Sequence, residues 1–137
     1  MTLDVTLSDL ERRAATKPPA LAELSDNLVF GVGDPDAKLM LVGEAPGEDE
    51  DLSGEPFVGR AGQLLDRILD SDEPASHEIY TTNIVKHRPP GNRNPQPDEI
   101  AQCEPYLRRQ VALVQPKVIL AMGRFAVQSL LNTTEPI

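Results

Sequence analysis

Apolar positions along the chain follow two alternating patterns, which predict strands and helices in turn. Short runs that are apolar on both faces, or rich in β-branched and aromatic residues, are typical of strands in a buried parallel sheet. Such runs cover residues 38–43, 78–85 and 116–123. Apolar residues at helical spacing instead indicate helices with one buried face. They predict helices over residues 6–15, 61–71, 98–115 and 124–131.

Prolines divide this pattern. Pro18 and Pro19 end the first helix and leave room for a single turn near Leu21. The four prolines of residues 86–97 predict an extended loop. Pro105, inside the helix expected over 98–115, predicts either a kink or a division into two shorter helices.

Strands that alternate with helices predict an α/β fold, a three-layer α/β/α arrangement with a short parallel sheet. Three strands are recognisable in the sequence. Sheets of this kind bind ligands beyond the carboxyl ends of their strands. The loops at 43–51 and 83–93 both leave from such ends. We therefore expect these two loops to share one rim of the sheet.

Length and charge limit the function classes. A chain of 137 residues, 39% of them hydrophobic, suits a single domain over residues 1–137. The net charge of −9 argues against a broad phosphate-binding face, because non-specific DNA affinity depends on lysine and arginine. Lys86, Arg88 and Arg93 nevertheless fall close together, which predicts a small local basic patch.

The sequence also indicates the compartment. Cys103 is the one cysteine of the chain, so no intrachain disulfide can form, as is usual in a reducing cytosol. The first residues lack the basic start and apolar run of a secretory signal, and no later run is long enough to span a bilayer. We expect a cytoplasmic, monomeric protein without membrane contact.

The stretch GEAPGEDED, residues 43–51, combines glycines with a cluster of acids. Its glycines allow the backbone to approach a ligand closely. The spacing of a dinucleotide-binding loop is absent, and carboxylates would repel a pyrophosphate. The alternating ligands of an EF-hand are absent as well, so the sequence predicts no metal site here. A solvated acidic loop is the remaining alternative for this stretch taken alone.

Four motifs occur together in the chain: GEAPG..ED, G.PFVG.AG.LLD, YTTNIVK.RPPGNR.P...EI..C.PYL..Q and P..IL..G..A...LL. In order and approximate spacing they resemble family four uracil-DNA glycosylases, and the resemblance covers about residues 28–132. It implies that the partner is uracil-containing DNA. It also implies hydrolysis of the N-glycosidic bond of deoxyuridine, which releases uracil in base excision repair.

The resemblance assigns roles to individual residues. Phe57 matches the aromatic platform on which a flipped uracil stacks, and Asn83 matches the amide that reads the edge of the base. Glu50 matches the catalytic acid that orients water near the anomeric carbon. Glu44 would line the pocket beside the base.

Two further assignments concern the backbone and the DNA. Gly43 begins the glycine-rich turn, and the amides of Glu44 and Ala45 are candidates for contact with a uracil oxygen. The proline-rich loop that carries Lys86, Arg88 and Arg93 suits contact with the DNA backbone.

The sequence departs from the family at its iron–sulfur cluster, which four cysteines hold in most members. The corresponding positions are near Thr16 and Pro19, at His87 and at Cys103. One thiolate and one imidazole cannot replace four thiolates, so we expect no cluster and no other cofactor. A neutral loop histidine is the expected state of His87, with a position facing DNA as the alternative.

The second departure is a His-Pro segment of the family that this sequence lacks. It predicts a fragment, a natural truncation or a protein that binds without efficient turnover. The main prediction remains a uracil-DNA glycosylase, and its alternative is a non-catalytic member of the same fold that binds uracil-containing DNA or a protein partner. A generic nucleotide-binding α/β domain is a third possibility.

Overall fold

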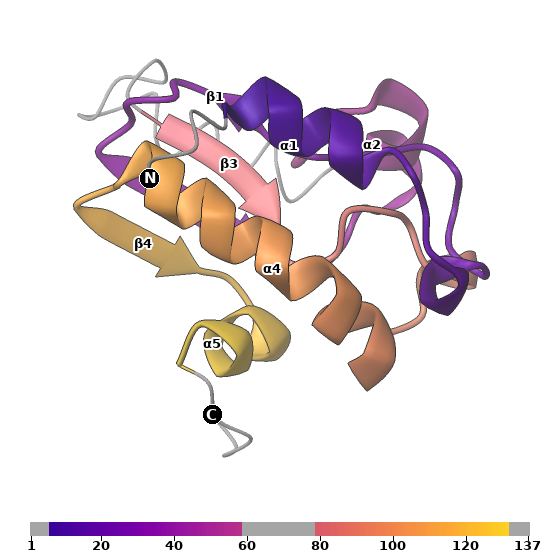
Figure 1. The fold of residues 1–137 in the computed structure, drawn as a ribbon. Helices are drawn as coiled ribbons and strands as arrows, with labels where there is room; N and C mark the ends of the chain where they lie inside the picture. The colour runs from indigo at the N-terminus through magenta and orange to yellow at the C-terminus, as the bar shows by residue number, and fades with distance from the viewer. Residues whose placement is uncertain (1–5, 59–78, 132–137) are drawn as a thin grey trace.

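The computed structural model describes residues 6–58 and 79–131. Its centre is a four-stranded sheet in the order β1-β3-β2-β4 (Figure 1). The central strand β2 (Leu39–Gly43) runs parallel to β3 (Ile79–Asn83) on one side and to β4 (Val118–Ala121) on the other. The α/β class and the three parallel strands of the sequence prediction are confirmed.

One strand was not predicted. The two-residue β1 (Val32–Gly33) pairs antiparallel with β3 at the edge of the sheet. Its shortness explains the omission, because two residues carry no readable periodicity. The helix expected over 61–71 lies outside the described residues.

The helices begin and end where local chemistry directs them. α1 (Leu7–Ala14) starts at the N-cap Thr6, whose hydroxyl accepts from the Asp9 amide while the Asp9 carboxylate accepts from the Thr6 amide. α4 (Pro97–Val114) is a single helix of 18 residues, so Pro105 does not divide it. The remaining helical segments are η1 (Pro19–Leu21), α2 (Glu48–Ser53), η3 (Pro90–Asn92) and α5 (Arg124–Leu131). None of the helices in the described part of the chain is both long and apolar enough to cross a membrane.

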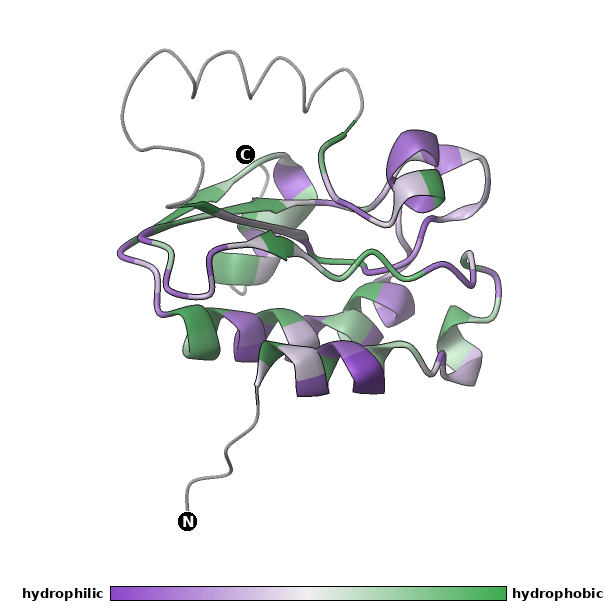
Figure 2. Cartoon of the chain, turned by 90° about the horizontal axis from the view of Figure 1, so that it is seen from above, coloured by the Kyte–Doolittle hydropathy of each residue, from purple (hydrophilic) through white to green (hydrophobic). Residues whose placement is uncertain are grey.

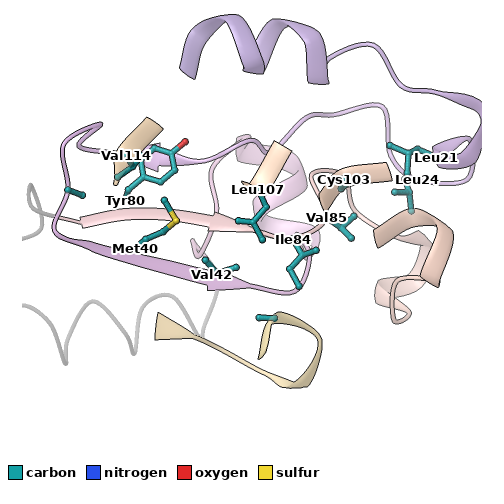
Figure 3. Close-up of a cluster of buried hydrophobic side chains, with 12 residues drawn as sticks. Leu21, Leu24, Met40, Val42, Tyr80, Ile84, Val85, Cys103, Leu107 and Val114 are labelled. Atoms are coloured by element: carbon teal, nitrogen blue, oxygen red, sulfur yellow. The ribbon is translucent and has the colours of Figure 1, made fainter. Parts of the chain in front are cut away.

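The main core lies between α4 and the sheet. α4 contacts α1, η1 and β3, and α1 and α4 lie together on one side of the sheet (Figure 2). In Figure 3, Leu21 and Leu24 lie beside Cys103 at one end of this core, and Val114 lies with Tyr80 and Met40 at the other. Burying one large apolar side chain stabilises the fold by about 1.5–3 kcal/mol. The core therefore fixes β3, and the loop after it, against α4.

The strand β4 differs from the prediction of a buried strand. Val118 is 59% exposed, Ile119 36% and Leu120 45%. β4 is an edge strand, and its principal contacts in the described part of the chain are with β2 and α5. An apolar run indicates a strand but does not show how many neighbouring elements cover it. The prediction that β4 is buried is therefore wrong.

Candidate functional site

The register of the sheet brings the two predicted loops together. Gly43, the last residue of β2, pairs with Asn83, the last residue of β3. Beyond the strands, the Ile84 amide donates to the Gly43 carbonyl and the Val85 amide donates to the Glu44 carbonyl, both at 3.0 Å. The two loops therefore share the rim at the carboxyl ends of the strands, as the sequence predicts.

Gly43 is a glycine because of its neighbours. A methyl group built on its Cα would lie 2.5 Å from Asn83 Oδ1 and 2.6 Å from Phe57 Cζ, inside normal contact distance for both. The backbone of Gly43 does not have the left-handed φ that favours glycine. The missing side chain is therefore required for space, and the Asn83 amide and the Phe57 ring converge on the same point.

Phe57 has a strained backbone. Its φ is 56°, a value that non-glycine residues with bulky side chains seldom adopt. Strain of this kind persists where the surroundings impose it, and it clusters at functional sites. The ring is half-buried, whereas Pro56 before it is buried. The turn therefore holds an aromatic ring partly open to solvent beside Gly43.

Glu50 is one of the groups that impose this turn. Its Oε2 accepts from the Val58 amide at 2.9 Å, and its Oε1 accepts from the Gly47 amide at 3.0 Å. The first bond fixes the residue after Phe57, and the second closes the start of α2. Glu50 is thus joined to the Gly43, Phe57 and Asn83 cluster through the Val58 amide.

The acidic cluster itself has a local explanation. The consecutive acids Glu48 to Asp51 occupy the first turn of α2. Carboxylates near a helix N-terminus are stabilised by the helix dipole, by about 0.3–1 kcal/mol each at exposed positions. α2 ends at Gly54, whose φ of 79° is the left-handed conformation of a helix C-cap. The sequence GEAPGEDED thus encodes a strand end followed by a short helix.

Glu44 and Ala45 follow Gly43 on the same rim. Both are half-buried, and Ala45 packs against the main core. Burial raises the pKa of the Glu44 carboxyl above its usual value, and the positive charge of Arg124 opposes this rise to a smaller extent. Glu44 therefore gains a proton more readily than an exposed glutamate.

Lys86 does not lie where a DNA contact requires it, which corrects the sequence prediction. Its side chain is 1% exposed. Its Nζ donates to Thr82 Oγ1, the Asn83 carbonyl and Gln110 Oε1 at 2.8, 2.5 and 2.5 Å. The sequence shows a lysine close to two arginines, but it does not show that this lysine points into the protein.

The two arginines are placed differently from each other. Arg93 forms a bidentate pair with the buried Glu99, at 2.8 and 2.9 Å, and a further bond to Glu23 at 3.2 Å. These partners raise the pKa of Arg93. Arg88 is half-exposed, and its Nε donates to Asn92 Oδ1 at 2.7 Å within the loop. Of the predicted patch, Arg88 is thus the residue that is partly exposed and has no carboxylate partner in the ion pairs of the described residues.

Three of the positions that correspond to cluster ligands lie around one cavity. Thr16, His87 and Cys103 line a hollow of about 410 Å³ between α1 and α4. Burial raises the pKa of the Cys103 thiol and lowers the pKa of His87, which is thereby held neutral as expected. His87 is 1% exposed, so it does not face DNA. A single buried thiol and an imidazole do not fit a cluster that four thiolates hold. Within the described ranges, no group of three or more potential ligands could hold a metal ion.

Comparison with known proteins decides the family. A family model described as the uracil DNA glycosylase superfamily matches residues 30–136. The chain belongs to this superfamily. It is 49% identical over 112 residues to the type-4 uracil-DNA glycosylase of Archaeoglobus fulgidus, a match that covers 82% of this chain and 56% of the relative. These findings confirm the resemblance to family four that the motifs indicate.

Two further superfamily members give the same picture. Identity is 48% over 105 residues to the type-4 uracil-DNA glycosylase of Saccharolobus solfataricus, covering 76% of this chain and 49% of the relative. Identity is 46% over 101 residues to the type-4 enzyme of Thermotoga maritima, covering 74% and 53%. The chain thus spans about half the length of these relatives.

Proposed function

We propose that this chain carries the uracil pocket of a uracil-DNA glycosylase. The reaction is hydrolysis of the bond between C1′ of deoxyribose and N1 of uracil in DNA. The observation that supports this function is the convergence of Phe57 and Asn83 over Gly43 at the carboxyl ends of two parallel strands. The names of the type-4 relatives support the same reaction.

The pocket reads the base by its face and by its edge. A flipped uracil stacks on the Phe57 ring, and stacking on an aromatic side chain contributes about 1–3 kcal/mol per base. The side-chain oxygen of Asn83, Oδ1, accepts from N3–H of uracil, and its side-chain nitrogen, Nδ2, donates to O4. Cytosine presents the opposite pattern of donor and acceptor at these positions. A fixed Asn83 therefore favours uracil, because a wrong base leaves buried polar groups unpaired.

Glu50 is the proposed acid of the reaction. As the glycosidic bond breaks, its electron pair leaves with N1 of uracil and positive charge builds on the sugar. A water molecule then supplies the oxygen that bonds to C1′, and the proton that it loses passes through the solvent to the uracil anion. A carboxylate near C1′ stabilises the positive charge and orients the water. Each carboxylate oxygen can accept more than one hydrogen bond, so the bonds to Gly47 and Val58 are compatible with this role.

Contact with the DNA backbone is assigned to the proline-rich loop, with Arg88 as its cation. The pairing of Arg93 with Glu99 keeps that loop in shape. Few phosphates are neutralised in this arrangement, so binding should weaken only modestly with added salt. The same proposal includes a cytoplasmic monomer without an iron–sulfur cluster, in line with the donor set around the cavity of His87 and Cys103.

One observation favours a second candidate function. Both carboxylate oxygens of Glu50 accept backbone amides that shape the turn at Phe57, which is a structural use of this residue. A protein that uses Glu50 only in this way would hold uracil-containing DNA without releasing the base.

Uracil release and DNA retention, measured together, separate the two functions. Oligonucleotides with uracil or thymine at one position are offered to this chain, to Glu50→Gln and to Asn83→Ala. Uracil release by the unmodified chain that falls in both variants supports the glycosylase. Retention of the uracil oligonucleotide without release supports the second candidate. Equal behaviour toward uracil and thymine would rule out both.

A further inference from the structure

Lys86 is a buried cation with an unusual set of partners. Its side chain is 1% exposed, and its three acceptors are uncharged oxygens of Thr82, Asn83 and Gln110. None of the ion pairs within residues 6–58 and 79–131 includes it. Burying a lysine without a carboxylate is costly. An apolar side chain of similar length would avoid the cost of burying the charge, so the presence of the amine points to a functional role.

The number of acceptors matches the charged form. An ammonium group has three N–H donors, whereas a neutral amine has two, so only the ammonium satisfies all three oxygens. Burial opposes the charge and lowers the pKa of Lys86 to about 7. The ring of Phe30, with its centroid 5.5 Å from Nζ, adds a favourable cation–π contact.

The acceptors are themselves held in place. Gln110 of α4 donates through Nε2 to the Phe30 carbonyl at 2.9 Å and to the Tyr80 hydroxyl at 3.1 Å. The Thr82 hydroxyl donates to the same Phe30 carbonyl at 2.7 Å. Lys86 therefore connects the end of β3 to a hydrogen-bond network that includes Gln110 of α4.

One of the Lys86 hydrogen bonds leads to the uracil pocket. The carbonyl of Asn83 accepts from Lys86 Nζ at 2.5 Å, and the amide that follows it, of Ile84, donates to the Gly43 carbonyl at 3.0 Å. Both polar groups of this one peptide are thus fixed. The peptide belongs to the same residue whose Oδ1 lies over Gly43 beside Phe57. A rotation of this peptide would turn the Asn83 amide away from the Phe57 ring.

We propose that Lys86 is a positioning residue of the uracil pocket, whose buried ammonium fixes the Asn83 peptide so that the Asn83 side chain faces the base. This role rests on the proposed function. The positioning role goes beyond the proposed function, because it assigns part of the base discrimination to a buried residue that contacts neither the base nor the DNA.

The test replaces Lys86 by methionine, which keeps the length of the side chain and removes its donors. The matched control is Tyr80→Phe, which removes a hydrogen bond at the far end of the same network and leaves the Lys86 partners in place. We expect Lys86→Met to reduce the preference for uracil over cytosine oligonucleotides about 10- to 100-fold, because a hydrogen bond from a charged donor is lost and Asn83 no longer presents a fixed donor and acceptor to the base. Tyr80→Phe should leave this preference unchanged. Lys86→Met combined with Asn83→Ala should be no worse than Asn83→Ala alone, since one residue acts through the other.

A second readout needs neither activity nor DNA binding. The side-chain amide resonances of Asn83 should shift in Lys86→Met and stay in place in Tyr80→Phe. If Lys86→Met does not fold, the unmodified chain is titrated instead. The Asn83 resonances should then move with a midpoint near pH 7, where Lys86 loses its proton. Burial raises the pKa of Cys103 and of Tyr80 and lowers that of His87, so the resonances of these three groups are followed in the same titration.

The outcomes separate the two levels of the proposal. Unmoved Asn83 resonances in Lys86→Met, or Asn83 resonances that stay in place while the Lys86 amine loses its proton, would overturn the positioning role. If the resonances move but neither the chain nor its variants prefer uracil, the positioning role holds and the proposed function fails.

Discussion

Gly43→Ala tests the pocket by filling it. The added methyl group would lie 2.5 Å from Asn83 Oδ1 and 2.6 Å from Phe57 Cζ, so the amide and the ring must both move. Stacking contributes about 1–3 kcal/mol. Each neutral hydrogen bond to the edge of the base adds about 0.5–1.5 kcal/mol. Losing the ring contact together with one edge contact costs about 1.5–4.5 kcal/mol, which corresponds to roughly 10- to 2,000-fold weaker binding of a uracil oligonucleotide.

The measurement is the affinity for oligonucleotides with uracil or thymine at one position, by fluorescence anisotropy, with thermal unfolding in parallel. Val114→Ala is the control, since it removes core methyl groups at the far end of α4 and should cost about 1–3 kcal/mol of stability without changing the preference for uracil. Crowding of Asn83 and Phe57 in Gly43→Ala should itself destabilise the fold by about 1–3 kcal/mol, so the control matches it in stability and differs from it in uracil affinity. Unchanged uracil affinity in Gly43→Ala would refute the account of the pocket.

Three other outcomes are expected. Between about pH 7 and 9 the unfolded chain keeps the Lys86 proton and the folded chain releases it. The free energy of unfolding, measured by chemical denaturation, should therefore rise with pH relative to Lys86→Met, by at most about 1.4 kcal/mol per pH unit. A falling or flat difference between the two proteins contradicts the lowered pKa of Lys86. Arg93→Ala should lower the free energy of unfolding by about 1.5–3 kcal/mol, because buried Glu99 loses its bidentate partner. The salt dependence of DNA binding should hardly change. A weaker salt dependence with unchanged stability would instead make Arg93 a phosphate contact. Purified protein should contain no stoichiometric iron or acid-labile sulfide, and His87→Cys should not introduce them. Four iron atoms per chain would show that other donors complete a cluster.

The sequence carried much of the fold because its signals were local. The apolar run of β2 and the helical spacing over residues 6–15 each act within a few residues, and β2 and α1 appear as expected. The helix α2 was not predicted, because its consecutive acids carry no apolar periodicity. The shared rim of the two loops also follows from strand order alone. The convergence of Phe57 and Asn83 on Gly43 agrees with the motif resemblance, although spacing alone could not place Phe57 there.

Other features depend on contacts between distant segments. Lys86 reads as a loop cation, and its burial depends on Gln110, 24 positions further along the chain. One signal in the sequence could have indicated a buried polar partner for Lys86. Gln110 lies at helical spacing from Cys103 and Leu107, and so on the buried face of α4. The exposure of β4 depends in the same way on which neighbours cover it, which no periodicity records. Glu50 shows a third case, where one residue shapes a turn and is also the proposed catalytic acid.

The structure of this chain bound to an oligonucleotide that contains one uracil tests the central claim most directly. The account predicts a uracil turned out of the base stack, with its face on the Phe57 ring and its N3 and O4 atoms within hydrogen-bond distance of the Asn83 amide. A uracil that stays stacked in the DNA, or that binds away from Gly43, would contradict it.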